Sequence, residues 1–431
     1  MKILMFGWEF PPHISGGLGT ACQGLTQGLA CYDTDVTFVL PTFSSAEKGE
    51  KFNIIGANQV QTDLTIQEVH HIRERIRVLS VLSPLQPYMT EEQYSDFIET
   101  NKVITDEEIF AGCQYDFSGN YGENLMNEVV RYSLVGGIVA ARDNFDVIHA
   151  HDWMTIPAGI EAARVSGKPL IVHAHALEFD RSGEHVNQQV YDIEREGYHK
   201  ADLVIAVSHY TKQRIINYYG VPEEKIRVVH NAVRHDAQYY KLKEAKRLKE
   251  KLVLFLGRIT FQKGPDYFLE AAAKVCNKVE NVRFAMAGNG DMFPRMVERM
   301  AELRLEDKFH FLGFVRGEDV ERIYALSDIY VMPSVSEPFG ITPLEAMVHN
   351  VPIIVSKQSG VSEILDHAIK IDFWDVDEMA EHIIKILSDE EYAQRLADLG
   401  SEQLKDIKWD IAAENVLNVY KEAIAQKEAL V

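Results

Sequence analysis

The apolar residues of this chain recur in short runs that are separated by segments of helix length. Continuous runs of Val, Ile, Leu and Phe between such segments are typical of parallel strands buried on both faces. Two series of runs predict two doubly wound α/β domains. The predicted strands are 2–6, 36–41, 145–151, 169–175, 201–208 and 225–231 in the first series, and 251–258, 282–288, 308–313, 328–334 and 351–356 in the second.

The two series meet at a segment that is dense in charge, KLKEAKRLKE at 241–250, which we interpret as a solvated linker or short helix. Apolar residues at helical intervals from 409 to 426 predict a long C-terminal helix. The predicted division is therefore an N-terminal domain at 1–238, a second domain at 239–408 and a final helix at 409–431.

The stretch between 43 and 145 is less regular. Alternating apolar residues at 75–83 predict β-strands. Seven aromatic residues follow between 88 and 121. They are interpreted either as a platform for an acceptor sugar or as ordinary packing of an insertion.

Composition narrows the class of protein. The chain has 431 residues, with 44 Lys and Arg against 65 Asp and Glu, a net charge of −21 that disfavours nucleic acid and anionic membrane as partners. Its four cysteines show no CxxC spacing, which indicates reduced thiols. The first apolar run is too short for a signal peptide, and no run of 18 apolar residues occurs. We expect a cytoplasmic protein with no membrane span.

A first candidate site is the loop Ser15-Gly16-Gly17-Leu18-Gly19, which follows the first strand and opens a helix. Free backbone N–H groups at such a position favour an anion, and glycines let the backbone approach a phosphate closely. The loop matches neither the GxGxxG nor the GK[ST] pattern. A tight turn without a ligand is the alternative interpretation.

Cations open the second series of strands. The strand LVLFLG is followed by Arg258 and then by Lys263-Gly264. Ligands of open α/β sheets bind at the carboxyl ends of strands, where two cations can neutralise a diphosphate. The alternative is an ordinary surface arginine and lysine.

Two carboxylates lie eight residues apart in SEPFGITPLE at 336–345. Glu337 stands in a loop after an apolar strand and Glu345 in the first turn of a helix. Carboxylates here can accept hydrogen bonds from sugar or ribose hydroxyls, and backbone N–H groups at Phe339, Gly340 and Ile341 can meet phosphate oxygens. A glutamate in a first helical turn is also ordinary helix chemistry.

Histidines end two further strands, in HAHDW at 149–153 and HAHAL at 173–177. His-x-His at a strand end places both rings on one side, which also resembles a metal site. No cysteine or carboxylate set completes either pair, so we expect no metal. At most one or two of these histidines are expected to touch substrate, the others being core or rim groups.

These motifs together resemble the retaining glycosyltransferases of family 4, which have the GT-B fold. The matching pieces run in family order over nearly the whole chain: GGLG at 16–19, HAHDW, HAHAL, VVHNAV at 228–233, GRITFQKG at 257–264, AGNGD at 287–291 and SEPFGITPLEA at 336–346. Within the family, WEFPP followed by GGLG and HAHDW looks most like the glycogen and starch synthase branch.

The resemblance implies two Rossmann-like domains that face an interdomain cleft, with the final helix at 409–431 packing back on the first domain. It further implies transfer of a hexose, expected to be glucose from UDP- or ADP-glucose, to an α-glucan, with no cofactor and no metal. Its implied catalytic residues are His175, Arg258, Lys263 and Glu337. Its implied donor-binding residues are Gly17, Asn231, Phe339, Gly340, Ile341 and Glu345, and Asp152 is implied on the acceptor side. Closure of the two domains would exclude water from the donor.

Two departures bear on the acceptor. The run HISGGL lacks the lysine that bacterial glycogen synthases carry before the first glycines, and Glu178, Asp180 and Arg181 in ALEFDRSGEH are expected to shape a different acceptor site. The main alternative is therefore a family 4 hexosyltransferase acting on another glycan, a small sugar or a lipid-linked acceptor. An isomerase or epimerase of this fold, or a non-catalytic nucleotide-sugar binder, explains the motifs less well.

Overall fold

The computed structural model describes residues 1–11, 16–42, 52–60, 125–183, 185–234 and 249–429. The predicted strands at 75–83, the aromatic stretch between 88 and 121 and most of the charged linker lie outside these residues. The chain divides into two compact units. The first unit contains Met1–Val207, Thr211–Val229 and Asp410–Val431, and the second contains Ser208–Tyr210 and His230–Trp409.

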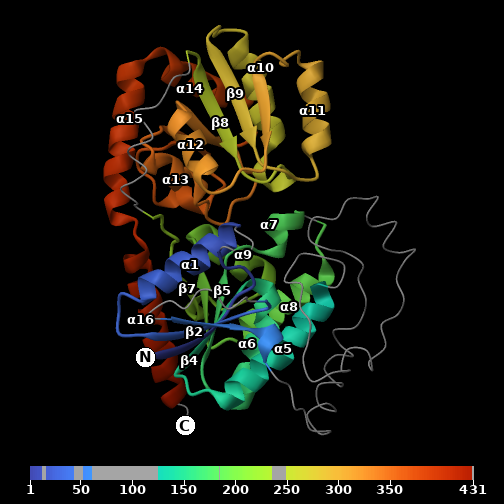
Figure 1. Ribbon diagram of the computed structural model, residues 1–431, viewed down its shortest axis with the longest axis vertical. Helices are drawn as coiled ribbons and strands as arrows, with labels where there is room; N and C mark the ends of the chain where they lie inside the picture. Colours follow the sequence, from blue (N-terminus) through green and yellow to red (C-terminus); the bar gives the residue numbers. More distant parts are fainter. Residues whose placement is uncertain (12–15, 43–51, 61–124, 184, 235–248, 430–431) are drawn as a thin grey trace, which may run out of the picture. The chain divides into compact units, whose positions relative to one another are not determined.

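The first unit is built on a parallel sheet that has seven strands among the described residues, in the order β3-β2-β1-β4-β5-β6-β7 (Figure 1). Its strands are β1 (Lys2–Phe6), β2 (Asp35–Leu40), β3 (Phe52–Gly56), β4 (Val147–His151), β5 (Leu170–Ala174), β6 (Leu203–Ala206) and β7 (Ile226–Val228). Its helices are α1 (Gly17–Leu29), α5 (Leu125–Arg142), α6 (Asp152–Ser166), α7 (Glu178–Ser182), α8 (Gln188–Lys200), α9 (His209–Tyr219) and α16 (Trp409–Glu428). Every residue of β4 and β5 is buried, which explains their unbroken apolar runs.

The second unit is built on a parallel sheet with six described strands, in the order β10-β9-β8-β11-β12-β13. These are β8 (Lys251–Leu256), β9 (Val282–Ala287), β10 (Phe309–Gly313), β11 (Ile329–Met332), β12 (Ile353–Ser356) and β13 (Ile369–Ile371). The helices are α10 (Pro265–Cys276), α11 (Phe293–Glu302), α12 (Glu318–Leu326), α13 (Thr342–Val348), α14 (Val376–Ser388) and α15 (Glu390–Gln403). Two parallel sheets covered by helices confirm the predicted fold class.

The C-terminal helix belongs mainly to the first unit, from Asp410 onward. The Arg227 guanidinium at the end of β7 pairs with Glu422 of α16, and Lys427 of α16 contacts Asp202 at 3.2 Å. The main change from first to second unit falls between Val229 and His230. Among the described helices, none combines the length and the apolar character that a membrane crossing needs.

Chain order reverses at one point in each sheet, between β1 and β4 and between β8 and β11. In both places the two strands are hydrogen-bonded neighbours. Open α/β sheets bind ligands outside the carboxyl ends of the strands that flank such a switch point. The loops after these four strands are therefore where a site is expected.

Candidate active site

The loop after β8 places two cations at the switch point of the second sheet. Arg258 donates from Nη2 to Oε1 of Gln262 at 3.1 Å, and Lys263 ends a 3₁₀ turn. Gly264 follows with φ of 64°, and a Cβ atom on it would lie 2.1 Å from the carbonyl oxygen of Pro333. A side chain cannot fit there, so the glycine lets the loop after β8 touch the backbone that follows β11.

That contact brings together two of the predicted site residues. The ammonium of Lys263 forms an ion pair with Glu337, whose carboxylate also accepts a hydrogen bond from Ser334 Oγ at 3.3 Å. The main chain of Glu337 is fixed as well, by Glu337 N–H donating to the Gln358 carbonyl at 3.0 Å and Gly360 N–H donating to the Glu337 carbonyl at 2.9 Å. The pair is therefore a rigid, mostly buried cation and anion at the ends of neighbouring strands.

The second predicted carboxylate, Glu345, lies in the first turn of α13. Its Oε2 accepts a hydrogen bond from the hydroxyl of Tyr324 at 3.0 Å. Burial raises the pKa of Glu345 to about 7. Tyr330 ties this turn to β8, because its hydroxyl contacts Thr342 Oγ1 at 2.8 Å and the Leu256 carbonyl at 3.2 Å. Sequence reasoning missed both tyrosines, since Tyr324 lies 21 residues before the carboxylate that it contacts and Tyr330 contacts Thr342 rather than Glu345.

The predicted backbone donors lie between the two carboxylates. Phe339 is buried, and its carbonyl accepts from Val361 N–H at 2.8 Å. Gly340 has φ of 101°, a conformation that L side chains rarely adopt, so glycine is needed for this turn. Asn231 is also buried within the second unit.

In the first unit, the glycine loop opens helix α1 as predicted, with Gly17 as the first helical residue. The backbone N–H groups of Gly16 and Gly19 already have an anionic partner, because both donate to Oε2 of Glu9, at 3.2 and 3.3 Å. A Cβ on Gly16 would lie 2.8 Å from the same oxygen, whereas one on Gly17 would meet nothing within 4 Å. The exposed Gly17 therefore remains open to a ligand, and Glu9 is a neighbour that the sequence did not reveal.

Asp152 and His175 come together after β4 and β5. Oδ1 of Asp152 accepts hydrogen bonds from the backbone N–H groups of His175 at 2.6 Å and Ala176 at 3.3 Å. Asp152 has φ of 59°, a left-handed conformation that costs a non-glycine residue about 1–2 kcal/mol. Burial raises its pKa to about 6. Asp152, with a strained backbone and a buried carboxylate, thus fixes the backbone at His175 by hydrogen bonding.

Four histidine side chains form two hydrogen-bonded pairs that stack on each other. Nε2 of His149 lies 3.2 Å from Nδ1 of His173, and Nδ1 of His151 lies 2.9 Å from Nε2 of His175. The ring centroids are 4.2 Å apart along β4 and 4.1 Å apart along β5. At one end of the stack, the hydroxyl of Tyr420 in α16 forms a hydrogen bond with Nδ1 of His149 at 2.5 Å.

Three of these histidines, His149, His151 and His173, have ring nitrogens within 4.8 Å of one another, close enough to suggest a metal site among the described residues. Their ring planes are nearly parallel, however, with angles of 18–29° between them. A histidine lone pair lies in the plane of its ring, so stacked parallel rings do not converge on one ion. The geometry fits hydrogen-bonded neutral pairs better than metal ligands.

The segment after His175 does not present its charged groups as predicted. Arg181 donates to Glu194 at 2.5 Å and to Glu178 at 3.2 Å, and Tyr219 donates to Glu194. Glu178 and Asp180 are buried. The expectation that these side chains line an acceptor site is therefore wrong; they stabilise the fold of α7 and α8 from within.

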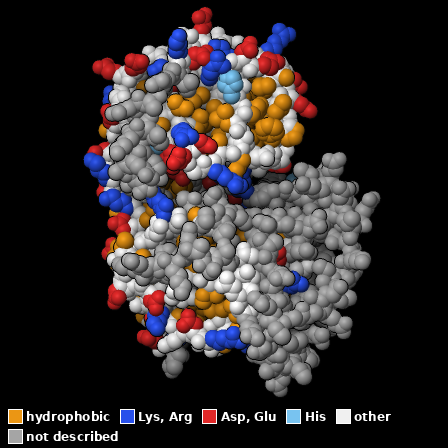
Figure 2. All heavy atoms as spheres, viewed as in Figure 1, with side chains coloured by type: hydrophobic (Ala, Val, Ile, Leu, Met, Phe, Trp, Pro, Cys, Tyr) orange, Lys and Arg blue, Asp and Glu red, His pale blue; other side chains and the backbone are white. Residues whose placement is uncertain are grey.

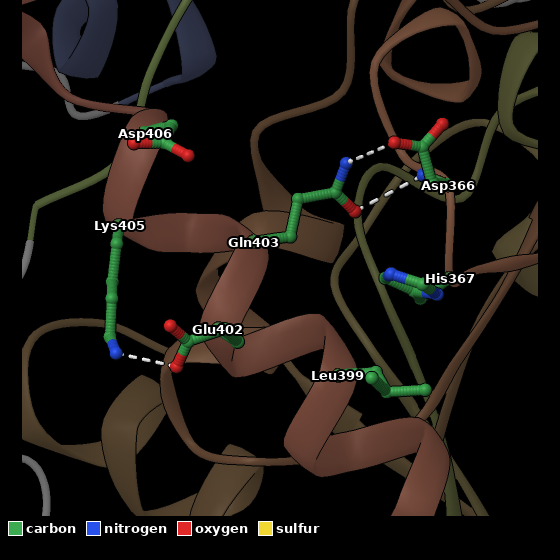
Figure 3. A pocket seen from close by; sticks show the side chains of 7 residues that line it. All are labelled: Asp366, His367, Leu399, Glu402, Gln403, Lys405 and Asp406. Atoms are coloured by element: carbon green, nitrogen blue, oxygen red, sulfur yellow. Dashed lines mark hydrogen bonds and ion pairs between the residues drawn. The ribbon is translucent and has the colours of Figure 1, made fainter.

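A depression is lined by residues of α15, of the turn after it and of the segment before β13, none of which is a predicted site residue (Figure 3). Its polar groups are paired among themselves: Gln403 contacts both the backbone N–H and the carboxylate of Asp366, and Lys405 contacts Glu402 (Figure 3). On the second unit, apolar side chains reach the surface among charged groups of both signs (Figure 2). The exposed large ones there include Phe261, Phe314 and Trp374.

Two protein-family models match the chain. Residues 130–237 match "Glycosyltransferase Family 4", and residues 237–403 match "Glycosyl transferases group 1". Together they include all predicted site residues except Gly17.

Similar proteins cover almost the full length. An uncharacterized glycosyltransferase of Methanocaldococcus jannaschii is 28% identical over 98% of this chain and 99% of its own. A glycogen synthase of Mycobacterium tuberculosis is 23% identical over 97% of this chain and 94% of its own.

Solved structures share the fold at lower identity. Sucrose-phosphate synthase of Thermosynechococcus elongatus has a TM-score of 0.72 at 17% identity, over 99% of each chain. HepE of Anabaena, in complex with UDP and glucose, has a TM-score of 0.67 at 17% identity, over 98% of this chain and 100% of its own. The catalytic domain of starch synthase IV from Arabidopsis thaliana, bound to ADP and acarbose, has a TM-score of 0.67 at 15% identity, over 98% of this chain and 99% of its own.

Proposed function

We propose that the chain, which has the GT-B fold and matches two glycosyltransferase family models over residues 130–403, is a retaining hexosyltransferase of glycosyltransferase family 4 that moves glucose from UDP- or ADP-glucose to an α-glucan. The full-length similarity to a glycogen synthase supports the acceptor class. The observation that carries the proposal is the ion pair of Lys263, in the loop after β8 that also contains Arg258, with Glu337 after β11, at the switch point of the second sheet. Free cysteines at Cys22, Cys31 and Cys276 fit a cytoplasmic enzyme.

Breaking the bond between C1 of the hexose and the diphosphate leaves negative charge on the phosphate. In the proposed mechanism Arg258 and Lys263 stabilise that charge, and the backbone N–H groups of Phe339, Gly340 and Ile341 contact phosphate oxygens. Two cations supply the charge that a divalent metal would otherwise provide, so we propose that the reaction needs none. Glu337 holds Lys263 in place before the donor binds and lies beside the hexose afterwards.

Nucleoside recognition is assigned to Glu345. Its carboxylate accepts hydrogen bonds from the ribose hydroxyls, while Tyr324 holds one of its oxygens in position. With the pKa of Glu345 raised to about 7 by burial, donor affinity is expected to rise as this carboxyl ionises around neutral pH. Asn231 is assigned a further donor contact.

Hexose and acceptor recognition is assigned to the first unit. His175 contacts a far hydroxyl of the hexose, Gly17 lies over the diphosphate, and Asp152 serves the acceptor side chiefly by fixing the backbone at His175. Retention of configuration is proposed to follow a same-face substitution.

The second candidate keeps the enzyme class and changes the acceptor to another glycan, a small sugar or a lipid-linked sugar. It is favoured by the first glycine loop, where the run HISGGL lacks the lysine that bacterial glycogen synthases carry. A mannosylfructose-phosphate synthase is also among the relatives, 25% identical over 64% of this chain.

Donor binding tests the site directly by isothermal titration with UDP-glucose, ADP-glucose, UDP and ADP. We expect one base to bind at least tenfold more tightly than the other, and Lys263→Ala to weaken binding of both the sugar nucleotide and the free diphosphate. Lys274→Ala is the matched control, because Lys274 pairs with Asp377 at 2.5 Å on the exposed surface of the same unit. Equal donor affinity in the two lysine variants would contradict the assignment.

A further inference from the structure

We propose that His151 is a positioning residue for His175. It fixes the tautomer of the neutral His175 imidazole, so that the N–H group is at Nδ1 and can donate a hydrogen bond to a hexose oxygen. The proposal rests on the proposed function for the role of His175 toward the sugar. The hydrogen bond that defines it, from His151 Nδ1 to His175 Nε2 at 2.9 Å, is independent of any substrate.

Two consecutive residues at the end of β4 hold His175. Asp152 accepts the His175 backbone N–H at 2.6 Å, and His151 contacts the ring. The His151 ring has no freedom to turn away, because it is fully buried, stacks on His149 at 4.2 Å and faces Phe38 at 6.3 Å. The strained backbone at Asp152, with φ of 59°, is the local distortion that this arrangement requires.

The remaining ring nitrogens indicate which way the shared proton points. Nε2 of His151 and Nδ1 of His175 are both buried with no partner among the described residues. Whichever ring donates in the pair, one of these two atoms is left as an N–H group and the other as a bare nitrogen. A buried N–H without a partner is rarer and more costly than a buried acceptor without one.

The two ends of the pair differ in their surroundings. His151 is fully buried, whereas His175, although its Nδ1 atom is buried, is partly exposed as a residue and lies in the segment that joins β5 to α7. The arrangement in which His151 donates places the unpaired N–H on His175, where a sugar oxygen can satisfy it. The reverse arrangement would leave an N–H on the fully buried His151 with no partner among the described residues.

Burial keeps the imidazoles of His151 and His175 neutral, so that each ring has one N–H group and one bare nitrogen. The pKa of His175 is lowered to about 3, chiefly by burial, and that of His151 is lowered for the same reason. The second stacked pair is fixed separately, by Tyr420 at Nδ1 of His149 and by His149 Nε2 at His173. His149 thus offers a control on the same strand that makes no hydrogen bond to His175.

The test is ¹⁵N NMR of the full chain labelled at histidine, because Nδ1–H and Nε2–H tautomers give distinct nitrogen shifts. His175→Gln assigns the signal. We expect wild-type His175 to be the Nδ1–H tautomer, His151→Phe to shift it to a mixture, and His151→Asn, which can place an amide near the position of Nδ1, to restore part of the original signal. His149→Phe should leave the His175 shifts unchanged.

A wild-type His175 protonated on Nε2, or His175 shifts unaltered in His151→Phe, would overturn the proposal. Because the wild-type spectrum alone decides the tautomer, the test survives a variant that fails to fold. With UDP-glucose and glycogen, His151→Phe should lower kcat about tenfold with KM within about twofold, as expected for one hydrogen bond lost in the transition state. If the wild-type chain turns over no donor, the proposed function fails while the tautomer still tests His151.

Discussion

Replacing Lys263 with alanine separates the proposed catalytic role of this cation from its structural role. In the native chain the Lys263 side chain is 20% exposed and that of its partner Glu337 is 8% exposed. Lys263→Ala leaves the Glu337 carboxylate nearly buried, with the hydrogen bond from Ser334 Oγ at 3.3 Å still in place. The Glu337 carboxylate can then compensate for the missing Lys263 ammonium only by binding a proton or by becoming partly hydrated.

The structure sets the size of each effect. Removing one partner of a fully buried ion pair costs about 3–5 kcal/mol. Because Lys263 is one-fifth exposed and Ser334 still donates to Glu337, we expect a loss of about 2–3 kcal/mol in the free energy of unfolding. Loss of a group that stabilises leaving-group charge lowers kcat by about 10²–10³-fold.

The double variant Lys263→Ala/Glu337→Gln distinguishes the two roles. It removes the unpaired charge, so we expect it to regain more than half of the lost stability, measured by urea denaturation, while kcat with the preferred donor stays as low as in Lys263→Ala. Because Glu337 is itself assigned a place beside the hexose, Glu337→Gln alone is the matched control, and a kcat in Lys263→Ala no lower than in Glu337→Gln would contradict a separate role for Lys263. Near-normal kcat in Lys263→Ala would refute it as well.

Three further predictions concern single positions. A carboxyl whose pKa is raised by folding destabilises the native state as pH rises from about 4.5 through 7. Glu345→Gln should therefore raise the free energy of unfolding at pH 8 by on the order of 1 kcal/mol and leave it unchanged at pH 4. Equal changes at both pH values would contradict this. Asp152→Ala loses two backbone hydrogen bonds and adopts the left-handed conformation poorly, so it should lower the free energy of unfolding by about 2–4 kcal/mol. Asp152→Asn tolerates that conformation and keeps an acceptor, so it should lower it by less than about 1.5 kcal/mol. Thermal melts that rank the two variants alike would argue against the strain. Gly264 and Gly313 both have a positive φ, but only at Gly264 would a Cβ atom clash, at 2.1 Å from the Pro333 carbonyl oxygen. Gly264→Ala should therefore destabilise the chain several-fold more than Gly313→Ala, where a Cβ meets nothing within 4 Å. Similar denaturation midpoints for the two variants would contradict the close approach.

Strand position was readable from the sequence because buried parallel strands form continuous apolar runs, and strand ends then located most of the candidate residues. His175 follows β5, Arg258 follows β8 and Glu337 follows β11 for this reason. The strands β3 and β13 were not predicted, since a polar residue interrupts each short apolar run, Asn53 in β3 and Lys370 in β13.

Partners contributed by distant segments could not be read in the same way. Tyr420 reaches His149 across 271 residues of sequence, and Lys263 reaches Glu337 across 74. Only the order of strands in the sheet and the path of α16 bring these groups together. Glu9 is a different case: it lies only seven residues from Gly16, but an isolated glutamate carries no sign that it will occupy the start of α1.

The central claim, glucosyl transfer from a nucleotide sugar to an α-glucan, is tested most directly with a panel of radiolabelled donors and glycogen as acceptor. The panel contains the UDP and ADP forms of glucose, with mannose and N-acetylglucosamine donors as comparisons. The account predicts ethanol-insoluble label from one glucose donor, abolished in Lys263→Ala and retained in Lys274→Ala. Donor hydrolysis without incorporation into glycogen would contradict the acceptor, and the absence of both hydrolysis and binding for every donor would contradict the account as a whole.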